Sequence, residues 1–173
     1  LSVTKSLKDP DGVAAGKKFN FAYVCEHKDP AQRKEGTFQL GAGESTTIDD
    51  IAAGSTCTIT EKDADVKGAD LATSWLDSVV IVKGKTHEVT ATNDYSAWRG
   101  SVELSKALAG SGKDLATLKD KKFNVNYVCT LGTDKKEVKK GTVEVAAGTP
   151  AKIDDVRYGA ACEFTEDTAN TEV

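Results

Sequence analysis

Hydrophobic and polar residues alternate with a period of two over several short segments of this chain. In the segment 17–25, which reads KKFNFAYVC, one face carries Phe19, Phe21, Tyr23 and Cys25. Successive residues of a β-strand point to opposite faces of the sheet, so this pattern is typical of a strand with one buried face. Gly, Asp and Asn residues separate such segments at intervals of about eight to twelve residues, as in β-sandwiches. The alternation therefore predicts an all-β fold.

The alternating segments occur twice. Residues 17–25 are matched by residues 121–129 (KKFNVNYVC), and residues 47–61 (TIDDIAAGSTCTITE) are matched by residues 152–166 (KIDDVRYGAACEFTE). The spacing between the segments is kept along with their sequence. A repeat of about a hundred residues has the size of a whole domain. The chain is therefore expected to be a duplication.

We expect two tandem immunoglobulin-like β-sandwiches, over residues 1–96 and 101–173, joined by a linker over residues 97–100. The second copy stops soon after Glu166, at the point where the first copy still has its final strands to come. We therefore expect the second domain to be truncated at its C-terminal strands. Either the sequence is cut short, or another chain supplies the missing strand.

Each copy carries two cysteines on different predicted strands, both on inward faces. Pairing within each domain is the simplest of the three possible connectivities and would join Cys25 to Cys57 and Cys129 to Cys162. Four reduced, buried thiols are the alternative. Neither a CxxC pair nor a zinc-type histidine spacing is present, so we expect no metal site. Disulfides indicate an oxidising, extracellular setting.

Composition excludes several classes of function. The 173 residues are 39% hydrophobic and 29% charged, with a net charge of −4 and both signs interspersed. No basic stripe is present, so we expect no nucleic acid partner. No apolar run is long enough to insert into a membrane. The sequence also lacks a nucleophile–base arrangement and a phosphate-binding loop, and we expect neither enzymatic activity nor a cofactor.

Polar residues interrupt the inward faces of three predicted strands. The first strand carries Lys5 between two apolar residues, the strand after the second cysteine ends in Glu61, and the last strand carries Asn93. In the second copy, Lys106 and Glu166 occupy the matching positions. Burying an unpaired charge costs several kcal/mol, so each of these residues requires a partner.

One reaction would account for all three polar residues. A buried lysine tends to lose its proton and become a nucleophile. The amine of Lys5 could then attack the side-chain carbonyl of Asn93 while Glu61 transfers protons and ammonia leaves. The product would be an amide crosslink between the first and last strands. In the alternative, Lys5 extends to the domain edge and forms an ordinary salt bridge with Glu61, and Asn93 merely precedes a turn.

Four motifs in this order resemble a known family over nearly the whole chain. They are Val-Thr-Lys on the first strand, Phe-x-Phe-x-Tyr-x-Cys, Ala-Gly-Ser-Thr-Cys-Thr-Ile-Thr-Glu, and the closing Val-Thr-Ala-Thr-Asn-Asp-Tyr. The pattern resembles the collagen-adhesin B-type domains of Gram-positive surface proteins and pilins. It resembles still more closely the disulfide-bearing repeats of actinobacterial surface proteins. The resemblance implies that Lys5 and Asn93 form an intramolecular isopeptide bond, with Glu61 as its catalytic residue.

The expected function is structural. We expect a secreted stalk module of a bacterial cell-surface adhesin or pilus, whose partners are neighbouring domains of the same surface protein. The alternative is an adhesive module that itself binds a host or partner protein through its loops or an open strand edge.

Overall fold

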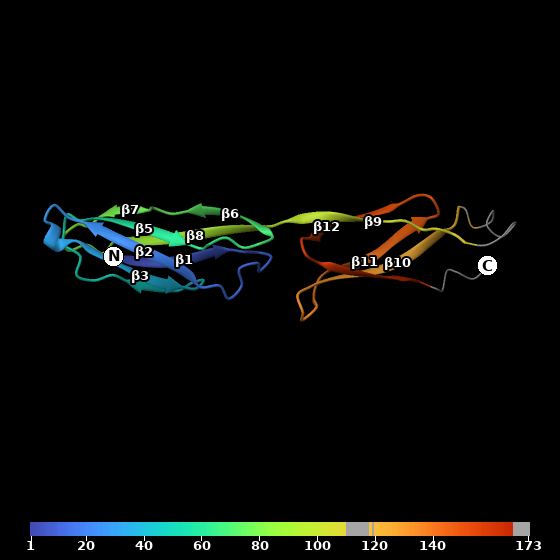
Figure 1. Ribbon diagram of the computed structural model, residues 1–173, viewed down its shortest axis with the longest axis horizontal. Helices are drawn as coiled ribbons and strands as arrows, with labels where there is room; N and C mark the ends of the chain where they lie inside the picture. Colours follow the sequence, from blue (N-terminus) through green and yellow to red (C-terminus); the bar gives the residue numbers. More distant parts are fainter. Residues whose placement is uncertain (110–117, 119, 168–173) are drawn as a thin grey trace. The chain divides into compact units, whose positions relative to one another are not determined.

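The computed structural model describes residues 1–109, 118 and 120–167 of the chain (Figure 1). The chain divides into two compact units, Leu1–Ala97 (unit 1) and Trp98–Val173 (unit 2). Almost all regular structure in the described residues is β-strand, with a single 3-10 turn, η1, at Pro30–Gln32. The all-β fold that the alternation predicts is thus confirmed. Within the described part of the chain, no helix has the length and apolar character needed to cross a membrane.

Unit 1 is a sandwich of two four-stranded sheets. One sheet has the order β4-β1-β8-β6, from β4 (Ser45–Thr47), β1 (Ser2–Lys8), β8 (Glu88–Ala97) and β6 (Ala69–Ser74). The other has the order β3-β2-β5-β7, from β3 (Lys34–Leu40), β2 (Phe19–Glu26), β5 (Thr56–Lys62) and β7 (Ser78–Val80).

The first and last strands of unit 1 are neighbours. β1 pairs with β8 in parallel, with Val3 opposite Val89, Lys5 opposite Ala91 and Leu7 opposite Asn93. The pairing extends along all of β1, whereas β4 covers only the first residues of its other edge. This adjacency brings together residues from the two ends of the unit.

The core of unit 1 follows from the alternation of its strands. The inward positions of β2, β5 and β8 are apolar and buried, and they comprise Phe19, Phe21, Ile59, Val89, Ala91 and Tyr95. Burying a side chain of the size of valine, isoleucine or phenylalanine stabilises the fold by about 1.5–3 kcal/mol. Three polar residues are nevertheless buried in the same unit: Lys5, Ser55 and Asn93.

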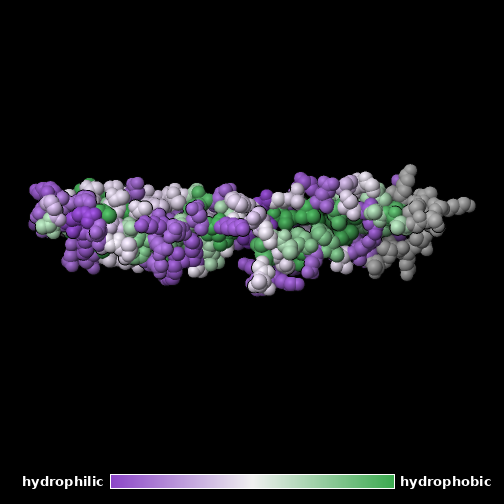
Figure 2. All heavy atoms as spheres, viewed as in Figure 1, coloured by the Kyte–Doolittle hydropathy of each residue, from purple (hydrophilic) through white to green (hydrophobic). Residues whose placement is uncertain are grey.

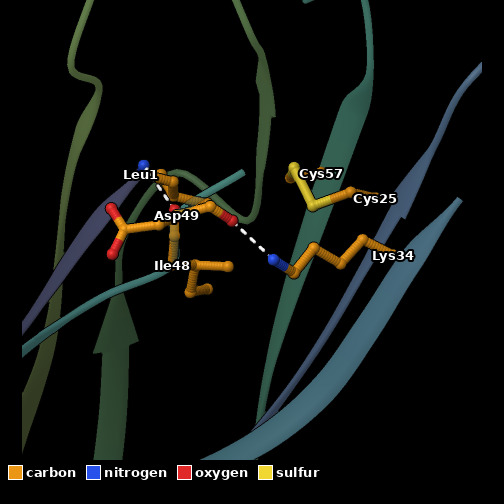
Figure 3. The surroundings of a disulfide bond; sticks show 6 residues. All are labelled: Leu1, Cys25, Lys34, Ile48, Asp49 and Cys57. Carbon is orange, nitrogen blue, oxygen red and sulfur yellow. Dashed lines mark hydrogen bonds between the residues drawn. A yellow bond between two sulfur atoms is a disulfide. The ribbon is translucent and has the colours of Figure 1, made fainter. Parts of the chain in front are cut away.

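A disulfide joins two neighbouring strands of one sheet in each unit. Cys25 on β2 lies directly opposite Cys57 on β5, and the two form a disulfide (Figure 3). In unit 2, Cys129 and Cys162 are joined in the same way across a matching strand pair. Both disulfides expected from the duplicated cysteines are therefore present. Beside the first, the amino group of Lys34 donates to the backbone carbonyl of Asp49 at 2.5 Å.

Unit 2 contains one three-stranded and one two-stranded sheet. The three-stranded sheet has the order β11-β10-β13, from β11 (Lys136–Ala146), β10 (Lys122–Leu131) and β13 (Ala161–Glu166). The two-stranded sheet pairs β9 (Arg99–Leu104) with β12 (Ala151–Arg157). β10, β11 and β13 match β2, β3 and β5 of unit 1 in sequence, whereas β9 and β12 overlap only in part with the residues that match β1 and β4. Within the described residues of unit 2, no strands correspond to β6, β7 and β8.

The linker expected over residues 97–100 is shorter than predicted. β8 continues to Ala97 and β9 begins at Arg99, so Trp98 alone separates the two strands. The carbonyl of Trp98 already accepts a hydrogen bond from the backbone of Tyr158, and its ring packs edge-on against the Tyr158 ring at 5.4 Å. Strand pairing in unit 2 therefore includes Arg99 and Gly100, which the sequence analysis assigns to the linker.

Removing the first disulfide should destabilise unit 1 strongly. The bond closes a loop of 32 residues in sequence separation, and its loss restores chain entropy worth about 3–4 kcal/mol to the unfolded state. In the double variant Cys25→Ala/Cys57→Ala, hydrogen exchange of the β2 amides should accelerate by a factor that corresponds to this loss. The matched variant Cys129→Ala/Cys162→Ala should accelerate exchange in β10 and leave β2 unchanged. Equal β2 protection in the first variant and in the wild type would contradict the prediction.

Candidate functional site

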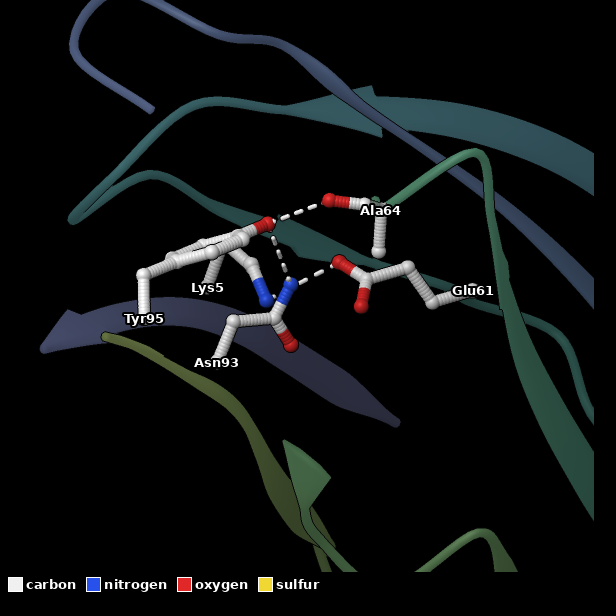
Figure 4. A network of polar contacts seen from close by, with 5 residues as sticks. All are labelled: Lys5, Glu61, Ala64, Asn93 and Tyr95. Carbon is white, nitrogen blue, oxygen red and sulfur yellow. Dashed lines mark hydrogen bonds and ion pairs between the residues drawn. The ribbon is translucent and has the colours of Figure 1, made fainter. Parts of the chain in front are cut away.

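Lys5 and Glu61 form a buried ion pair between the two sheets of unit 1. Lys5 comes from the inward face of β1, and Glu61 comes from the facing sheet, near the end of β5. The Lys5 Nζ lies 2.9 Å from the Glu61 Oε1, and the two side chains are 0% and 1% exposed (Figure 4). The salt bridge between Lys5 and Glu61 that the alternative expected is therefore present, but it is buried, and Lys5 does not extend to solvent at the domain edge.

The surroundings of the Lys5 amine are aromatic. Its Nζ lies 4.5 Å from the centre of the Phe19 ring and 5.9 Å from that of Phe21. Burial lowers the pKa of Lys5, and the hydrogen bond and charge of Glu61 counteract only part of this effect. Removal from water disfavours the charged ammonium more than one carboxylate partner restores it. The site thus makes the neutral amine, which is the nucleophilic form, easier to reach than it is for a lysine in water.

Asn93 is held beside the pair by Tyr95. The Asn93 Nδ2 donates to the Tyr95 hydroxyl at 3.4 Å, and this hydroxyl donates to the backbone carbonyl of Ala64 at 2.5 Å (Figure 4). Burial raises the pKa of the Tyr95 hydroxyl, so it stays protonated and able to donate. The Asn93 Oδ1 is buried and has no hydrogen-bond partner among the described residues. The hydrogen bond to Tyr95 therefore fixes the orientation of the Asn93 amide group and leaves its carbonyl oxygen without a partner.

The strand register places Lys5 and Asn93 on the same face of one sheet. Lys5 lies opposite Ala91 on β8, and Asn93 is two residues further along the same strand. Residues two apart in a strand point to the same face, so both side chains enter the space between the sheets. In Figure 4 the ends of Lys5, Glu61 and Asn93 converge there. The arrangement brings an amine, a carboxyl group and a carboxamide together in a water-excluded core.

Sequence reasoning identified these three residues but missed the part played by Tyr95 and Ala64. Tyr95 lies two residues after Asn93 on β8, so the alternation of the strand places it on the same inward face. The signal that could have found it is a hydroxyl group on a buried position, since a buried tyrosine hydroxyl usually has a hydrogen-bond partner. Ala64 contributes only its backbone carbonyl, which no side-chain pattern could reveal.

The matching pair in unit 2 is less enclosed. The Lys106 Nζ lies 2.5 Å from the Glu166 Oε2, and the side chains are 23% and 30% exposed. The Lys106 Nζ lies 4.7 Å from the centre of the Phe123 ring, which repeats the relation of Lys5 to Phe19. No asparagine of the described residues occupies the place that Asn93 has in unit 1.

Metal binding has no support in the described part of the chain. No three or more His, Cys, Asp or Glu side chains are grouped there so that they could hold an ion.

Several solved structures are similar to this chain at low identity. Two B repeat units of the collagen-binding protein of Staphylococcus aureus align with 18% identity and a TM-score of 0.49, covering 96% of this chain and 43% of that one. The major pilin of Streptococcus pyogenes aligns with 14% identity and a TM-score of 0.45, covering 96% and 81%. An adhesin of Mobiluncus mulieris, with intramolecular disulfide, isopeptide and ester crosslinks, aligns with 12% identity and a TM-score of 0.38, covering 90% and 69%.

These neighbours are the classes of protein that the sequence motifs resemble: B repeats, a pilin and an adhesin. The chain spans less than half the length of the S. aureus structure. With TM-scores below 0.5, none of these likenesses assigns a role to a residue here. No curated protein sequence matches the chain.

A family model matches both copies of the repeat. It covers residues 1–96 and residues 102–173, which together are nearly the whole chain. The chain therefore belongs to the family described as Domain of unknown function (DUF5979).

Proposed function

We propose that unit 1 forms an amide bond between Lys5 and Asn93, and that the chain is a load-bearing structural module of a bacterial cell-surface adhesin or pilus. The observation that carries the proposal is the buried Lys5–Glu61 pair beside the partnerless carbonyl oxygen of Asn93. If these positions served only to stabilise the core, we would expect apolar residues there, because a buried ion pair is often no more stabilising than well-packed apolar side chains. A reaction between these groups explains why polar residues are buried at these positions.

The bond forms by exchange of one amide for another. The neutral Lys5 Nζ attacks the Asn93 Cγ, a new C–N bond forms, the bond from Cγ to Nδ2 breaks, and ammonia leaves. Glu61, whose carboxyl group is 2.9 Å from the attacking nitrogen, takes the proton that the amine loses and passes one to the departing nitrogen. The fold also lowers the barrier by holding the amine beside the carboxamide, because groups held in place react far faster than separate molecules.

Tyr95 acts as a positioning residue in this proposal. Its hydroxyl holds the Asn93 nitrogen at 3.4 Å, on the opposite side of the amide from Oδ1. The same hydroxyl is anchored by the Ala64 carbonyl at 2.5 Å, so the amide cannot turn over without breaking this chain of hydrogen bonds. The carbonyl oxygen is thereby kept in a fixed position, without a competing partner, as charge develops on it.

The position of the bond suits a protein that is pulled from its ends. Lys5 lies near the start of unit 1 and Asn93 near its end, on adjacent parallel strands. Force applied at Leu1 and Ala97 would pass from β1 to β8 through the new bond. Residues 6–92 would then carry no load. This role is structural and not enzymatic, since the chain modifies only itself and only once.

The disulfides support an extracellular location for this module. Both units contain one, at Cys25–Cys57 and at Cys129–Cys162. Disulfides persist in oxidising compartments such as bacterial surfaces. Neighbouring domains of the same surface protein are the partners that a tandem module of this kind requires.

An intact-mass measurement tests the bond directly. Reduced, denatured wild-type protein should weigh one ammonia less than its sequence, because one carboxamide nitrogen has been lost. Glu61→Gln keeps the shape of the side chain but cannot transfer the proton in the same way, and it should restore the full mass. Asn93→Ala serves as the unlinked reference. Wild-type protein of full mass would show that Lys5 and Asn93 are not bonded.

Replacing Tyr95 by phenylalanine should slow the reaction without preventing folding. The ring stays in the core, but Asn93 loses its orienting partner and the Ala64 carbonyl is left unsatisfied, at a cost of about 1–3 kcal/mol. We expect a mixture of linked and unlinked protein in freshly purified Tyr95→Phe, resolved by mass over time. Tyr158→Phe, at an exposed position of unit 2, should react like the wild type. Full linkage in fresh Tyr95→Phe would remove Tyr95 from the mechanism.

Single-molecule pulling tests the mechanical role. Wild-type unit 1, held at its two ends, should show no unfolding extension from residues 6–92. Asn93→Ala should extend by roughly 3.5 Å for each released residue, and the disulfide should withhold residues 26–56 until a reductant is added. If the wild type and Asn93→Ala extend equally, the bond does not bear the load.

A further inference from the structure

The exposed large hydrophobic side chains of unit 1 all lie on one short segment. They are Leu76, Val80 and Val82, which are 71%, 55% and 45% exposed. Residues 1–97 are all described, so this observation covers the whole of unit 1. In Figure 2 the visible face of unit 1 is mostly hydrophilic (purple and white), with only small hydrophobic areas (green). Apolar residues grouped on such a surface are typical of a contact with another protein.

This segment contains the outer strand of a sheet. β7 stands at the end of the order β3-β2-β5-β7, so one of its edges has no neighbouring strand (Figure 1). Val80 lies opposite Thr56 and points to the outer face, whereas Val79 lies opposite the buried Cys57. Residues 78–82 read SVVIV and contain neither a proline nor a charged residue. Natural proteins commonly protect an edge strand with such residues, and β7 lacks this protection.

The hydrogen bonds between β7 and β5 show which backbone groups face the open edge. The carbonyl of Asp77 accepts a hydrogen bond from β5, and the amide of Ile81 donates one to the residue just before β5. In an antiparallel pair, the backbone groups of alternate residues point to opposite edges of the strand. Ser78 and Val80 therefore direct their amide and carbonyl groups away from β5, towards the open edge.

The turn after β7 limits the length of this edge. The Val82 amide donates to the His87 Nε2 at 3.1 Å, and the Val82 carbonyl accepts from the Lys85 amide at 3.2 Å. These backbone groups are therefore already satisfied within unit 1. Within β7, the groups open to a further strand are the amides and carbonyls of Ser78 and Val80, which make two donors and two acceptors.

We propose that the open edge of β7 binds the same edge of a second copy of the chain, antiparallel, about a two-fold axis at Val79. In the register that pairs β7 with itself over its full length, Ser78 lies opposite Val80 of the second copy. The amide of each of these residues donates to the carbonyl of the other, and the two-fold axis repeats the arrangement. Every open backbone group of both strands is then satisfied. The inference goes beyond the proposed function and does not depend on the bond between Lys5 and Asn93.

The side chains are also complementary in this register. Continued beyond the strand, it places Leu76 opposite Val82 of the second copy, and the two-fold axis repeats this apolar pair. The exposed apolar side chains of both copies therefore cover one another on the outer face. Asp77 lies opposite Ile81 of the second copy, so no like charges meet there. An unrelated strand would have to match these positions by chance, whereas a second copy matches them by symmetry.

The contact is small, because only the three residues of β7 pair in each copy. Contacts of this size are typical of weak, transient complexes. A high local concentration of chains raises the fraction that is paired, as it does for any weak site that is presented many times. The consequence would be lateral association between neighbouring copies of unit 1.

Two cysteine variants test the contact and its register in the full 173-residue chain. Directly opposite residues of an antiparallel pair have Cα atoms about 4.5–5.5 Å apart, close enough for a disulfide. A mixture of Ser78→Cys and Val80→Cys should therefore give a disulfide-linked dimer under mild oxidation. Each variant alone should link about tenfold more slowly or not at all, because its new thiol lies opposite an unchanged residue. The four native cysteines are already paired in disulfides and do not compete.

A charge on the edge tests the association without a crosslink. Val80→Lys brings two like charges close together in the dimer and removes two apolar side chains from it. It should weaken self-association by about tenfold or more, measured by sedimentation over a range of high protein concentrations. Val128→Lys makes the same change at an exposed valine of unit 2 and should sediment like the wild type.

The outcomes separate the contact from its register. Wild-type protein that stays monomeric at every concentration, with no dimer from the cysteine mixture, would overturn the proposal. Weakening by Val128→Lys equal to that by Val80→Lys would show that the chains associate through another surface. If either cysteine variant links to itself as fast as the mixture does, the register centred on Val79 is wrong.

Discussion

The organisation of unit 1 depends on one buried amino group. Lys5 stands at an inward position of β1, where the alternation of the strand leaves no route to solvent, and its side chain is completely enclosed. Burying a charge of this kind costs several kcal/mol unless a partner is close. Glu61 of the facing sheet is that partner, so a single contact at 2.9 Å connects the two layers of the sandwich. The same enclosure lowers the pKa of Lys5 and favours a reactive amine.

The two copies of the repeat show what encloses the pair. Lysine, glutamate and a phenylalanine ring are arranged alike in both units. They differ in the strand beside the lysine, because β8 is present in unit 1 and no described strand takes its place in unit 2. The exposure of the lysine and glutamate side chains rises accordingly. Residues of the pair therefore provide the chemistry, while the neighbouring strand provides the dry environment in which that chemistry is effective.

The strands in the two sheets of unit 1 are joined by different kinds of connection. The disulfide fixes β2 to β5 at the centre of one sheet. The other sheet has no disulfide and relies on the pairing of β1 with β8, which brings the first and last strands together. An amide bond between Lys5 and Asn93 would give this second sheet its own covalent connection. Each sheet of unit 1 would then have one covalent crosslink between two of its strands, a disulfide in one sheet and an amide bond in the other.

Alternation, duplication and residue type were enough to predict the all-β fold, the pairing of the cysteines within each domain and the three polar residues of the site. Those features depend on local patterns: alternation along a strand, cysteines on inward faces, and polar residues where apolar ones are expected. The folded chain was needed to see that β8 lies parallel to β1, that Tyr95 and the Ala64 carbonyl orient Asn93, and that β9 begins directly after Trp98. These features join residues far apart in the chain, or involve backbone atoms that every residue shares. Side-chain patterns along a sequence do not identify these distant residues or backbone partners, because strand pairing and burial are fixed only when the two sheets pack together.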